Sequence, residues 1–600
     1  MCGICGIWKF GNITDEDKDL VRLMNKEQAH RGPDDEGIYY NANVVLGHRR
    51  LSIIDLTSAG HQPLCYKDRF WISFNGEIFN YIELREELKK NGYCFDTNSD
   101  TEVICAAYDF YGENCFEKFN GFWAMAIYDI RKQKLCLSRD RYGIKPLYYC
   151  KIGNKLVFAS EIKAILCDSE IERKVNKKVI ADFLIYGVSD HTEETFFKNI
   201  YTFPVASCAV ITKEDNWRFQ EYYRLKVNYD LGKKGAETDF KRFRKIFYNS
   251  IKLRLRSDVE IAACLSGGLD SSAIVCAVNR IYKKRKKNIK TFSAHFSGFK
   301  LDESEYIDEV LKYACISGEK VSPGAEEFWK DLDKLIYLQD QPFSSASAYV
   351  GYYLMKQVNN NGIKVILDGQ GADEILCGYR KSRIYFIKKL IKNKRYFSAL
   401  KEGICSINQF ATSNNFALDI IKITGILFGK NKSSNPYVNK TYLETNYDYA
   451  KDDFIYNDIR KISLPCILRT VDRNSMAFSI EDRLPFLDYN LVDFALGLPL
   501  QSKIKDGWSK YIMRKSLELP EKIKYRKTKI GFVPPEAEWL QKLNTEIQKV
   551  FLNKKFRSGE YVNRDAILRD WDKIIANPVE IPLFRFLCLE KWMQIYNVTS

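Results

Sequence analysis

A buried strand that passes through a glycine-rich loop into a helix is the feature that most restricts the fold of this chain. The segment VEIAACLSGGLDSSAIVCAVNRIY, residues 259–282, begins with an apolar strand over Val259–Leu265. A turn rich in glycine and serine follows over Ser266–Ser272, and we expect a helix from Ala273. The same strand–loop–helix order recurs at wide spacing after about residue 240, which is typical of an α/β domain.

The loop over Ser266–Ser272 has the composition of a phosphate-binding turn. Such a loop directs backbone N–H groups and serine hydroxyls toward one point, beside the positive end of a helix dipole. It lacks the GK[ST] ending of a Walker A motif, and no GxGxxG of a dinucleotide fold follows it. A purely structural turn is the alternative, but two adjacent glycines and three serines favour a ligand.

The segment KVILDGQGADE, residues 364–374, places carboxylates directly after a second strand. The strand is predicted over Lys364–Leu367, and Asp368, Asp373 and Glu374 follow in a glycine-rich turn. Carboxylates at the carboxyl end of a strand suit magnesium, although they could also be only a helix N-cap with first-turn charges. Together the two loops predict a nucleotide site across the carboxyl ends of two parallel strands.

The first 205 residues have a different pattern, with many short alternating strands. Residues 70–92 predict a strand, a tight Asn-Gly turn and an amphipathic helix, and residues 122–140 predict two strands joined by a polar turn. We therefore expect an α+β domain rich in antiparallel strands. A polar, charged stretch over about residues 213–240 has the composition of a linker.

The N-terminal hexapeptide MCGICG places a cysteine at the second residue. Removal of Met1 would leave Cys2 with a thiol and a free α-amine, which is partly neutral near pH 8 and can accept the thiol proton. A terminal cysteine can therefore be a nucleophile that carries its own base. Cys2 and Cys5 also form a CxxC, which could be redox-active or half of a zinc site, but no second CxxC completes such a site.

Composition excludes several other classes of protein. With 46% hydrophobic and 28% charged residues the chain is globular, and its most apolar stretch, residues 416–428, is short and interrupted by Asp419 and Lys422. The N-terminus has no signal-peptide pattern, and 17 scattered cysteines predict reduced thiols and a cytoplasmic protein. The net charge of +16 is accompanied by no nucleic-acid-binding motif, so we expect anionic small-molecule ligands rather than nucleic acid or membrane partners.

The chain resembles the glutamine-hydrolysing asparagine synthetases of the asparagine synthetase B type. The motifs that carry the resemblance occur in order along the chain: CGICG (2–6), HRGPD (30–34), HRRLSI (48–53), FNGEIFNY (74–81), SDTEV (99–103), SRDRYGIKPLYY (138–149), LSGGLDSS (265–272), DGQGADE (368–374), SIEDRLPFLD (479–488) and KIGF (529–532). Residues 380–450 match no motif of this family.

The resemblance implies an N-terminal nucleophile glutaminase domain with a four-layer αββα fold over residues 1–210. It also implies a linker region over 211–240 and an α/β synthetase domain of the ATP-pyrophosphatase type over 241–600. The implied ligands are glutamine, aspartate and ATP with Mg²⁺, and the implied assembly is compatible with a homodimer.

In the glutaminase half, the resemblance implies that Cys2 attacks the side-chain amide of glutamine. Asn75 and the backbone N–H of Gly76 would form the oxyanion hole. Arg50 would bind the glutamine carboxylate, and an acidic pair would bind its ammonium. The implied glutamine-binding residues are Arg50, Leu51, Ser52, Ile53, Ile54, Asn75, Gly76, Glu77 and Asp100.

In the synthetase half, the resemblance implies that ATP and a carboxylate form an acyl-adenylate, which ammonia then attacks to leave amide, AMP and pyrophosphate. Asp270 and Asp373 would bind magnesium, and Lys529 would contact the phosphates, with Arg526 and Lys527 close by. The implied ATP-binding residues are Leu265, Ser266, Gly267, Gly268, Leu269, Asp270, Ser271, Ser272, Ala294, Asp368 and Gly369.

One residue departs from the family pattern. Gln370 stands where the best-known members have a glutamate, and an amide cannot accept a proton from ammonia as a carboxylate can. The identity of the carboxylate that accepts the nitrogen therefore stays open. Aspartate is the first hypothesis, and a sugar acid or a peptide carboxylate is the alternative. A third hypothesis is a regulator that binds ATP or glutamine without turnover. Asp340 and Ser344–Ser347 are expected to line the acceptor pocket.

Overall fold

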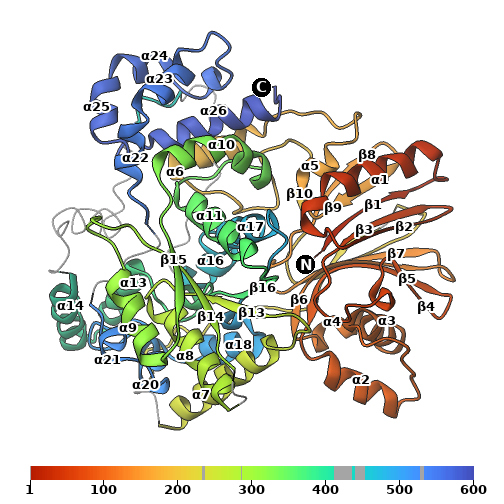
Figure 1. The fold of residues 1–600 in the computed structure, drawn as a ribbon, viewed down its shortest axis with the longest axis horizontal. Helices are drawn as coiled ribbons and strands as arrows, with labels where there is room; N and C mark the ends of the chain where they lie inside the picture. Colours follow the sequence, from red (N-terminus) through yellow and green to blue (C-terminus); the bar gives the residue numbers. More distant parts are fainter. Residues whose placement is uncertain are drawn as a thin grey trace.

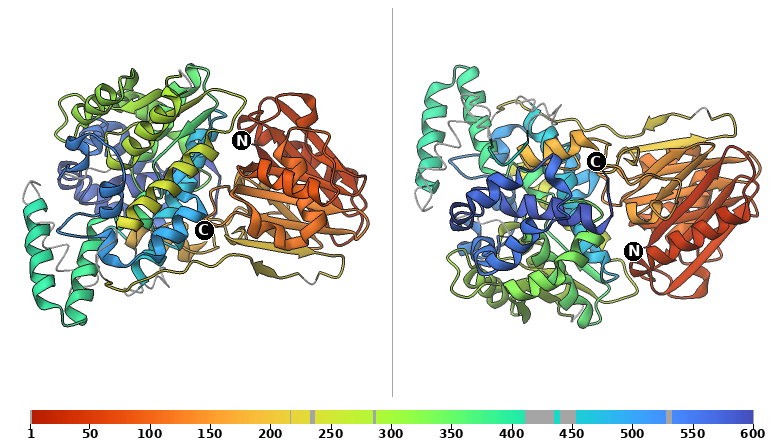
Figure 2. Two further views of the ribbon diagram at one scale, coloured as in Figure 1. Left: turned by 90° about the horizontal axis from the view of Figure 1, so that it is seen from below. Right: turned by 90° about the horizontal axis from the view of Figure 1, so that it is seen from above.

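The fold consists of two halves that pack side by side (Figure 1). A computed structural model describes residues 2–215, 217–232, 237–284, 287–410, 435–439, 453–527 and 533–599. The N-terminal half is built mainly from β-strands, and the C-terminal half from helices around one sheet (Figure 2). Among the described residues, no helix combines the length and the apolar character that a membrane crossing requires.

The N-terminal half contains two six-stranded sheets in which neighbouring strands run antiparallel. The first sheet has the order β10 (Tyr201–Thr202), β8 (Tyr148–Ile152), β9 (Lys155–Ala159), β1 (Gly3–Lys9), β3 (Val44–Arg50), β2 (Asp35–Asn41). The second has the order β12 (Phe219–Glu221), β11 (Ser207–Ile211), β7 (Lys134–Arg139), β6 (Gly121–Asp129), β5 (Phe70–Ile78), β4 (Leu64–Tyr66). β12 lies within residues 211–240, so part of that stretch belongs to the second sheet.

Alternation along the strands produces four layers. In β1, Cys5 and Ile7 pack in one core cluster with Val21 of α1 (Asp15–Glu27), whereas Ile4 and Trp8 belong to the cluster between the two sheets. The outer face of the second sheet is covered by α2 (Tyr81–Lys90), α3 (Asp100–Tyr111) and α4 (Cys115–Lys118) (Figure 1). The predicted αββα fold is confirmed.

The predicted Asn-Gly turn in residues 70–92 is wrong. β5 continues through this dipeptide, because Asn75 pairs with Ala124 and Gly76 with Trp123 across the ladder to β6. A Cβ atom at Gly76 would overlap the carbonyl oxygen of Phe122, so the glycine serves a close approach of two strands rather than a turn. The helix predicted after it is α2.

The C-terminal half is built on a five-stranded parallel sheet, which confirms the predicted α/β class. Its order is β15 (Gly318–Val321), β14 (Lys290–Ala294), β13 (Ile261–Cys264), β16 (Val365–Leu367), β17 (Glu481–Arg483). The strand order reverses between β13 and β16, so a crevice opens at the carboxyl ends of these two strands. Ligands of open α/β sheets bind at such a switch point.

Helices surround this sheet on both faces (Figures 1 and 2). The longer ones are α7 (Glu237–Arg254), α8 (Leu269–Lys283), α9 (Ser304–Ala314), α10 (Ala325–Gln339), α11 (Ser347–Asn360), α13 (Arg380–Lys392), α14 (Tyr396–Phe410), α17 (Leu464–Met476), α18 (Tyr489–Gly497), α23 (Asn544–Leu552) and α26 (Leu583–Ile595). The shorter ones are α12 (Ala372–Ile375), α16 (Phe454–Arg460), α19 (Leu500–Lys503), α20 (Tyr511–Ser516), α21 (Glu521–Lys524), α22 (Glu536–Lys542), α24 (Arg564–Arg569) and α25 (Trp571–Ala576).

The helix that follows β13 begins four residues earlier than predicted, at Leu269 rather than Ala273. Gly267 has a left-handed backbone (φ +70°), and Gly268 is the extended N-cap residue, so these two glycines complete the turn. Residues 269–272 therefore belong to the first turn of α8, and the loop itself is only Leu265–Gly268.

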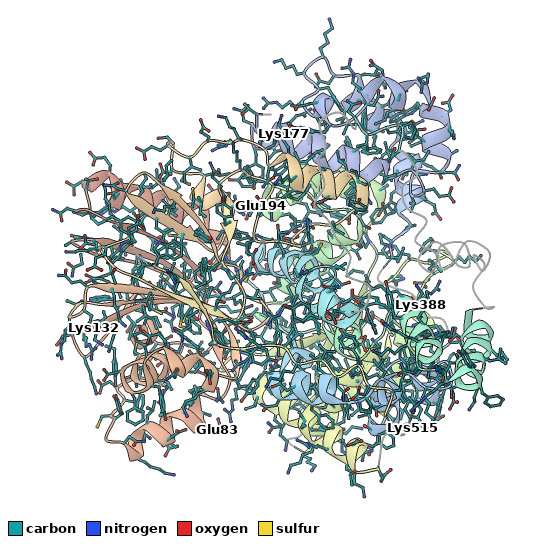
Figure 3. All side chains as sticks on the ribbon, turned by 180° about the vertical axis from the view of Figure 1, so that it is seen from behind. Glu83, Lys132, Lys177, Glu194, Lys388 and Lys515 are labelled. Atoms are coloured by element: carbon teal, nitrogen blue, oxygen red, sulfur yellow. The ribbon has the colours of Figure 1, made fainter. Side chains whose placement is uncertain are left out.

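Helices α5 (Ile162–Ile165) and α6 (Lys177–Tyr186) of the N-terminal half belong to the same apolar cluster as α10 and α26 of the C-terminal half. Figure 1 shows α6 beside α10 and α26. Among the labelled lysines of Figure 3, Lys132 lies at the left of the molecule, Lys177 at the top, and Lys388 and Lys515 at the right. The basic excess is thus distributed over several surfaces.

A buried network of ion pairs joins the two halves. Arg31 of the N-terminal half donates to Asp472 of α17 at 2.8 and 3.0 Å and to Glu161 at 2.8 Å. Arg473 donates to Asp340 at 2.8 Å and to Asp472 at 3.1 Å. All of these side chains are at least 97% shielded from solvent, so each charge depends on its partners.

Replacement of Arg473 by Met should destabilise the protein by about 3–5 kcal/mol, because buried carboxylates would lose their cation. Guanidinium denaturation followed by tryptophan fluorescence measures the change. Arg22→Met is the matched control, since Arg22 pairs with Asp19 on the exposed face of α1 and should contribute less than about 1 kcal/mol. Equal effects of the two substitutions would contradict a structural role for the buried network.

Candidate functional site

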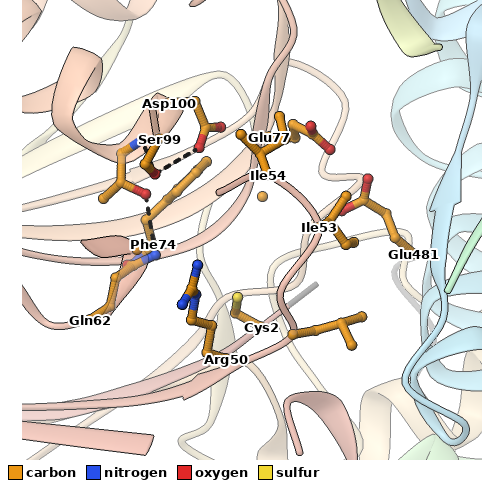
Figure 4. Close-up of a pocket in the computed structure, with 14 residues that line it drawn as sticks. Cys2, Arg50, Ile53, Ile54, Gln62, Phe74, Glu77, Ser99, Asp100 and Glu481 are labelled. Atoms are coloured by element: carbon orange, nitrogen blue, oxygen red, sulfur yellow. Dashed lines mark hydrogen bonds between the residues drawn. The ribbon is translucent and has the colours of Figure 1, made fainter. Parts of the chain in front are cut away.

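The first of two candidate pockets lies in the N-terminal half, around Cys2 (Figure 4). It is a narrow cavity of about 40 Å³. The lining residues are Cys2, Arg50, Leu51, Ile53, Ile54, Gly60, Gln62, Phe74, Gly76, Glu77, Ser99, Asp100, Thr101 and Glu481. All but the last come from the N-terminal half, so one residue of the C-terminal half completes the pocket.

Cys2 directly precedes β1 and lies at the base of the pocket. Its backbone nitrogen donates to Asn75 Oδ1 at 3.1 Å, and its carbonyl accepts from Arg31 Nε at 3.0 Å. Burial raises the pKa of the Cys2 thiol, while the Leu51 backbone N–H and the charge of Arg50 oppose the rise. The thiol therefore needs a nearby proton acceptor, and its own α-amine would be the nearest one after removal of Met1.

The CxxC interpretation of Cys2 and Cys5 does not fit the structure. Cys5 points away from the pocket toward α1, where its thiol donates to Asn25 Oδ1 at 3.2 Å. All 17 cysteines are described, and all are free thiols. Within the described ranges, no cluster of three metal-binding side chains of the His, Cys, Asp or Glu type occurs.

Arg50 is held rigidly at one wall of the pocket. Its guanidinium donates to the backbone carbonyls of Thr57, at 2.9 Å, and of Asp55. The loop that supplies these carbonyls passes so close that a Cβ atom on Gly60 would overlap the guanidinium. A planar, oriented guanidinium is suited to bind a carboxylate through two parallel hydrogen bonds.

The opposite wall carries buried carboxylates (Figure 4). Asp100 accepts from the Ile78 backbone N–H at 2.9 Å, and burial raises its pKa to about 6. Glu77 forms an ion pair with Arg483 of β17, and Arg483 also pairs with Glu481 at 2.6 Å. Burial raises the pKa of Glu77, whereas Arg483 overcomes the effect of burial at Glu481 and lowers its pKa. This wall is suited to an ammonium group.

Most of the predicted glutamine-binding residues meet in this pocket. Ser52 is outside it, with its backbone N–H bound to Asp34. Asn75 is not a lining residue either, but its Oδ1 accepts from the Cys2 nitrogen, so it lies next to the nucleophile. Ser99 and Thr101 were missed although they flank Asp100 in the predicted motif SDTEV. Gln62 lies in no motif of the family. Glu481 lies in the motif SIEDRLPFLD, but that motif belongs to the synthetase half, so nothing in the sequence placed it near Cys2.

The second pocket is a cavity of about 560 Å³ at the switch point of the parallel sheet. It is lined by Cys264, Leu265, Ser266, Ser271, Phe292, Ser293, Ala294, Phe343, Ser344, Ser345, Ser347, Ala348, Gly351, Leu354, Met355, Asp368, Gln370, Asp373, Tyr379, Arg380, Cys466, Ile467, Thr470, Val471, Asn474 and Asp482. Of the lining residues from β14, α11 and α17, Ala294 and Ser347 were predicted, whereas the others lie in no motif that could have marked them in the sequence.

The two predicted loops touch each other at this pocket. A Cβ atom on Gly369 would come within 3.0 Å of Asp270 Cβ and 3.1 Å of the Ser271 backbone nitrogen, so glycine allows the contact. Within the first loop, the Ser266 N–H donates to Ser271 Oγ at 3.2 Å. The other predicted ATP-binding residues, Gly267, Gly268, Leu269, Asp270, Ser272 and Gly369, are not part of the cavity wall.

Asp270 and Asp373, the predicted magnesium ligands, converge on one cation. Lys510 Nζ lies 2.5 Å from Asp270 Oδ2 and 2.6 Å from Asp373 Oδ1, and its side chain is almost completely buried. Two carboxylates that hold one positive charge are a donor set that fits Mg²⁺, which binds through one or two carboxylates together with substrate phosphates and water. Lys510 was not predicted, because nothing in its sequence neighbourhood marks it.

Two other predicted residues have different outcomes. Lys529 lies outside the described residues, whereas its neighbour Arg526 donates to the Gly267 carbonyl at 3.2 Å and stacks on Tyr306.

Asp340 does not line the acceptor pocket, contrary to our expectation. It is buried between the halves, where it accepts from the Ile162 backbone at 2.9 Å and pairs with Arg473. Ser344, Ser345 and Ser347 do line the cavity.

Comparison with known proteins assigns both halves. Residues 1–223 match the family model of a glutamine amidotransferase domain, and residues 242–594 match the model of asparagine synthase. The chain is 31% identical to asparagine synthetase [glutamine-hydrolyzing] 1 of Bacillus subtilis, over 95% of this chain and 92% of that protein.

Two further relatives have similar names. A putative asparagine synthetase [glutamine-hydrolyzing] 2 of Methanocaldococcus jannaschii is 36% identical over 70% of this chain and 85% of its own length. Asparagine synthetase [glutamine-hydrolyzing] 3 of B. subtilis is 28% identical over 92% of this chain and 91% of its length. With a cysteine pocket in one half and a cavity at the switch point of a parallel sheet in the other, this chain belongs to the family of glutamine-hydrolysing asparagine synthetases.

Proposed function

We propose that this protein converts aspartate to asparagine, with glutamine as the nitrogen donor and ATP as the activating substrate. The observation that carries the proposal is the arrangement of β17 between the two pockets. Glu481 lines the pocket of Cys2, and the next residue, Asp482, lines the cavity of the synthetase half. Only one edge strand therefore separates the first pocket, where ammonia would be released, from the second pocket, where it would react.

In the first half-reaction, Cys2 attacks the side-chain amide of glutamine. Arg50 binds the α-carboxylate, and the carboxyl groups of Glu77 and Asp100 face the α-ammonium. Asn75 and the Gly76 N–H stabilise the oxyanion. Glutamate leaves after hydrolysis of the thioester, and ammonia passes to the second pocket.

In the second half-reaction, ATP binds over the loop Leu265–Gly268 and the start of α8, with Leu265, Ala294 and the Asp368–Gly369 backbone around the adenosine. Asp270 and Asp373 would hold Mg²⁺, which when bound neutralises charge on the phosphates. Lys510, already between these carboxylates, adds a fixed positive charge beside them. The aspartate side chain becomes an acyl-adenylate, and ammonia replaces AMP.

The identity of the acceptor needs a direct test, because Gln370 lines the acceptor cavity. Asparagine formed from aspartate, ATP and glutamine, together with stoichiometric AMP, supports the proposal. Normal glutamine hydrolysis without any asparagine favours another carboxylate, such as a sugar acid or a peptide. Absence of both reactions favours a regulator that binds without turnover.

We also propose a cytoplasmic location, in accord with 17 free thiols, and retain a homodimer as a prediction. Size-exclusion chromatography with light scattering tests the assembly. A monomeric mass at micromolar concentration would contradict it.

Cys2→Ala should lower glutamine-dependent asparagine formation by at least about a thousandfold, because the nucleophile is lost. Synthesis with ammonium chloride should persist, since the second pocket is intact. Coupled assays for glutamate and asparagine measure both. Cys94→Ala, at an exposed thiol, is the control. Glutaminase activity in Cys2→Ala, or Met1 retained in the mass spectrum of active enzyme, would contradict the proposed nucleophile.

Gly60→Ala should raise KM for glutamine about tenfold, because the new methyl group overlaps the Arg50 guanidinium and displaces it. The rate with ammonium chloride should stay within twofold of wild type. Gly497→Ala is the matched control, since a methyl group at that position would meet no other described part of the chain within 4 Å. An unchanged KM in Gly60→Ala would show that Arg50 does not bind glutamine.

Asp270→Asn and Asp373→Asn should each lower ATP-dependent asparagine formation at least about a hundredfold. Either change would remove one of the two carboxylates that would hold Mg²⁺ beside the phosphates. Basal glutaminase activity should stay within twofold of wild type. Asp308→Asn, at an exposed carboxylate on α9, controls for a loss of charge alone. Loss of both activities in a folded variant would argue against two separable sites.

A further inference from the structure

Strand β17 presents successive side chains to two different pockets. It is the edge strand of the parallel sheet, and its register places Glu481 opposite Val365 and Asp482 opposite Ile366 of β16. Side chains alternate between the faces of a strand. Glu481 and Arg483 therefore meet Glu77 on the glutaminase side, whereas Asp482 faces the cavity of the synthetase half.

Asp482 differs from the other carboxylates in the wall of this cavity. Asp368 accepts from the Gly369 N–H at 2.5 Å and from Gln370 Nε2 at 3.4 Å, and Asp373 pairs with Lys510. Asp482 is 2% exposed, and neither of its oxygens has a hydrogen-bond partner in the part of the chain that the structure describes. A buried carboxyl without partners is costly, so its retention requires an explanation.

The surroundings of Asp482 favour proton uptake. Burial and the negative charge of Asp368 raise the pKa of Asp482 well above its ordinary value. Glu481 and Asp472 act in the same direction, and the cation of Lys145 opposes them. A carboxylate with a raised pKa holds a proton more readily at neutral pH than an ordinary surface aspartate does.

Gln370, in the same cavity, cannot serve as a proton acceptor. Its amide Nε2 is directed to Asp368, and the amide group has no basic site at neutral pH. Ammonia that attacks a carbonyl carbon becomes a protonated amine in the tetrahedral intermediate, and this proton must leave before the amide is stable. The cavity thus needs a base that its glutamine does not supply.

We propose that Asp482 is the catalytic base that removes the proton from the ammonia-derived nitrogen during amide formation. The nitrogen lone pair forms the C–N bond, and the carbonyl π electrons move to oxygen. Asp482 then takes one N–H proton. The carbonyl re-forms as the C–O bond to AMP breaks, and AMP leaves with the bonding electrons. Asp482 returns the proton to solvent after product release. This inference rests on the proposed function.

The test uses full-length Asp482→Asn with three measurements. Amide formation from aspartate, ATP and ammonium should fall about 10²–10⁴-fold, the usual contribution of a general base. Aspartate-dependent exchange of pyrophosphate into ATP, which reports the adenylate before nitrogen attack, should stay within threefold of wild type. Glutaminase activity should be unchanged, which also shows that the variant is folded. Asp168→Asn, a buried carboxylate outside both pockets, is the matched control.

Hydroxylamine separates a base from a merely structural residue. Its conjugate acid is far more acidic than ammonium, so the intermediate it forms releases a proton to water without help. Asp482→Asn should therefore form aspartyl hydroxamate at a rate within about tenfold of wild type. An equal loss with ammonium and hydroxylamine, a loss of pyrophosphate exchange, or amide formation at the wild-type rate would each overturn the role of Asp482.

Failure of the proposed function would look different. Wild-type protein would then show no aspartate-dependent pyrophosphate exchange, whereas the inference on Asp482 fails only where wild type performs this exchange. Addition of Gln370→Glu to Asp482→Asn places a carboxylate elsewhere in the wall of the same cavity. Recovery of at least tenfold in amide formation, but not in hydroxamate formation, would further support a missing base in the single variant.

Discussion

The buried ion pair between Arg31 and Asp472 is the interaction on which the arrangement of the two sites depends. Arg31 binds the Cys2 carbonyl through Nε and the carboxylate of α17 through its other nitrogens. The same helix lines the synthetase cavity through Thr470 and Asn474. One guanidinium thus relates the position of the nucleophile to a wall of the second pocket, and burial makes any loss of its partners costly.

Strand β17 is the second element that connects the two pockets. Only three residues long, it supplies Arg483 to Glu77, Glu481 to the glutamine pocket and Asp482 to the synthetase cavity. An edge strand has one side without a neighbouring strand. The N-terminal half can therefore pack against β17, while pairing with β16 fixes the register of β17. The wall shared by the pockets is therefore made of backbone that is fixed in a sheet, which suits transfer of a small neutral molecule.

Much of the fold was predictable because its signals are local. The antiparallel strands before residue 205, the buried strand before the loop at Ser266 and the strand before Asp368 appear in the structure as expected. The errors also have local causes. Asn75 and Gly76 have the composition of a turn but pair with β6. Gly267 and Gly268 complete the preceding turn, so α8 begins at Leu269, before the apolar residues from which its start was predicted. Propensity was overridden by pairing across the sheet in the first case.

The sequence alone determined the nature of the chemistry, because covalent neighbours define each motif. These motifs are a cysteine at the second residue, a hydroxyl-rich loop after one strand and three acidic residues after another. The tertiary structure decided which residues from distant parts of the chain share a site. Lys510 lies between Asp270 and Asp373, Glu481 enters the pocket of Cys2, and Asp340 lies in the interface rather than in the acceptor pocket. These contacts join residues that are far apart along the chain. Folding of the C-terminal half brings Lys510 to Asp270 and Asp373, whereas packing of the two halves places Glu481 and Asp340.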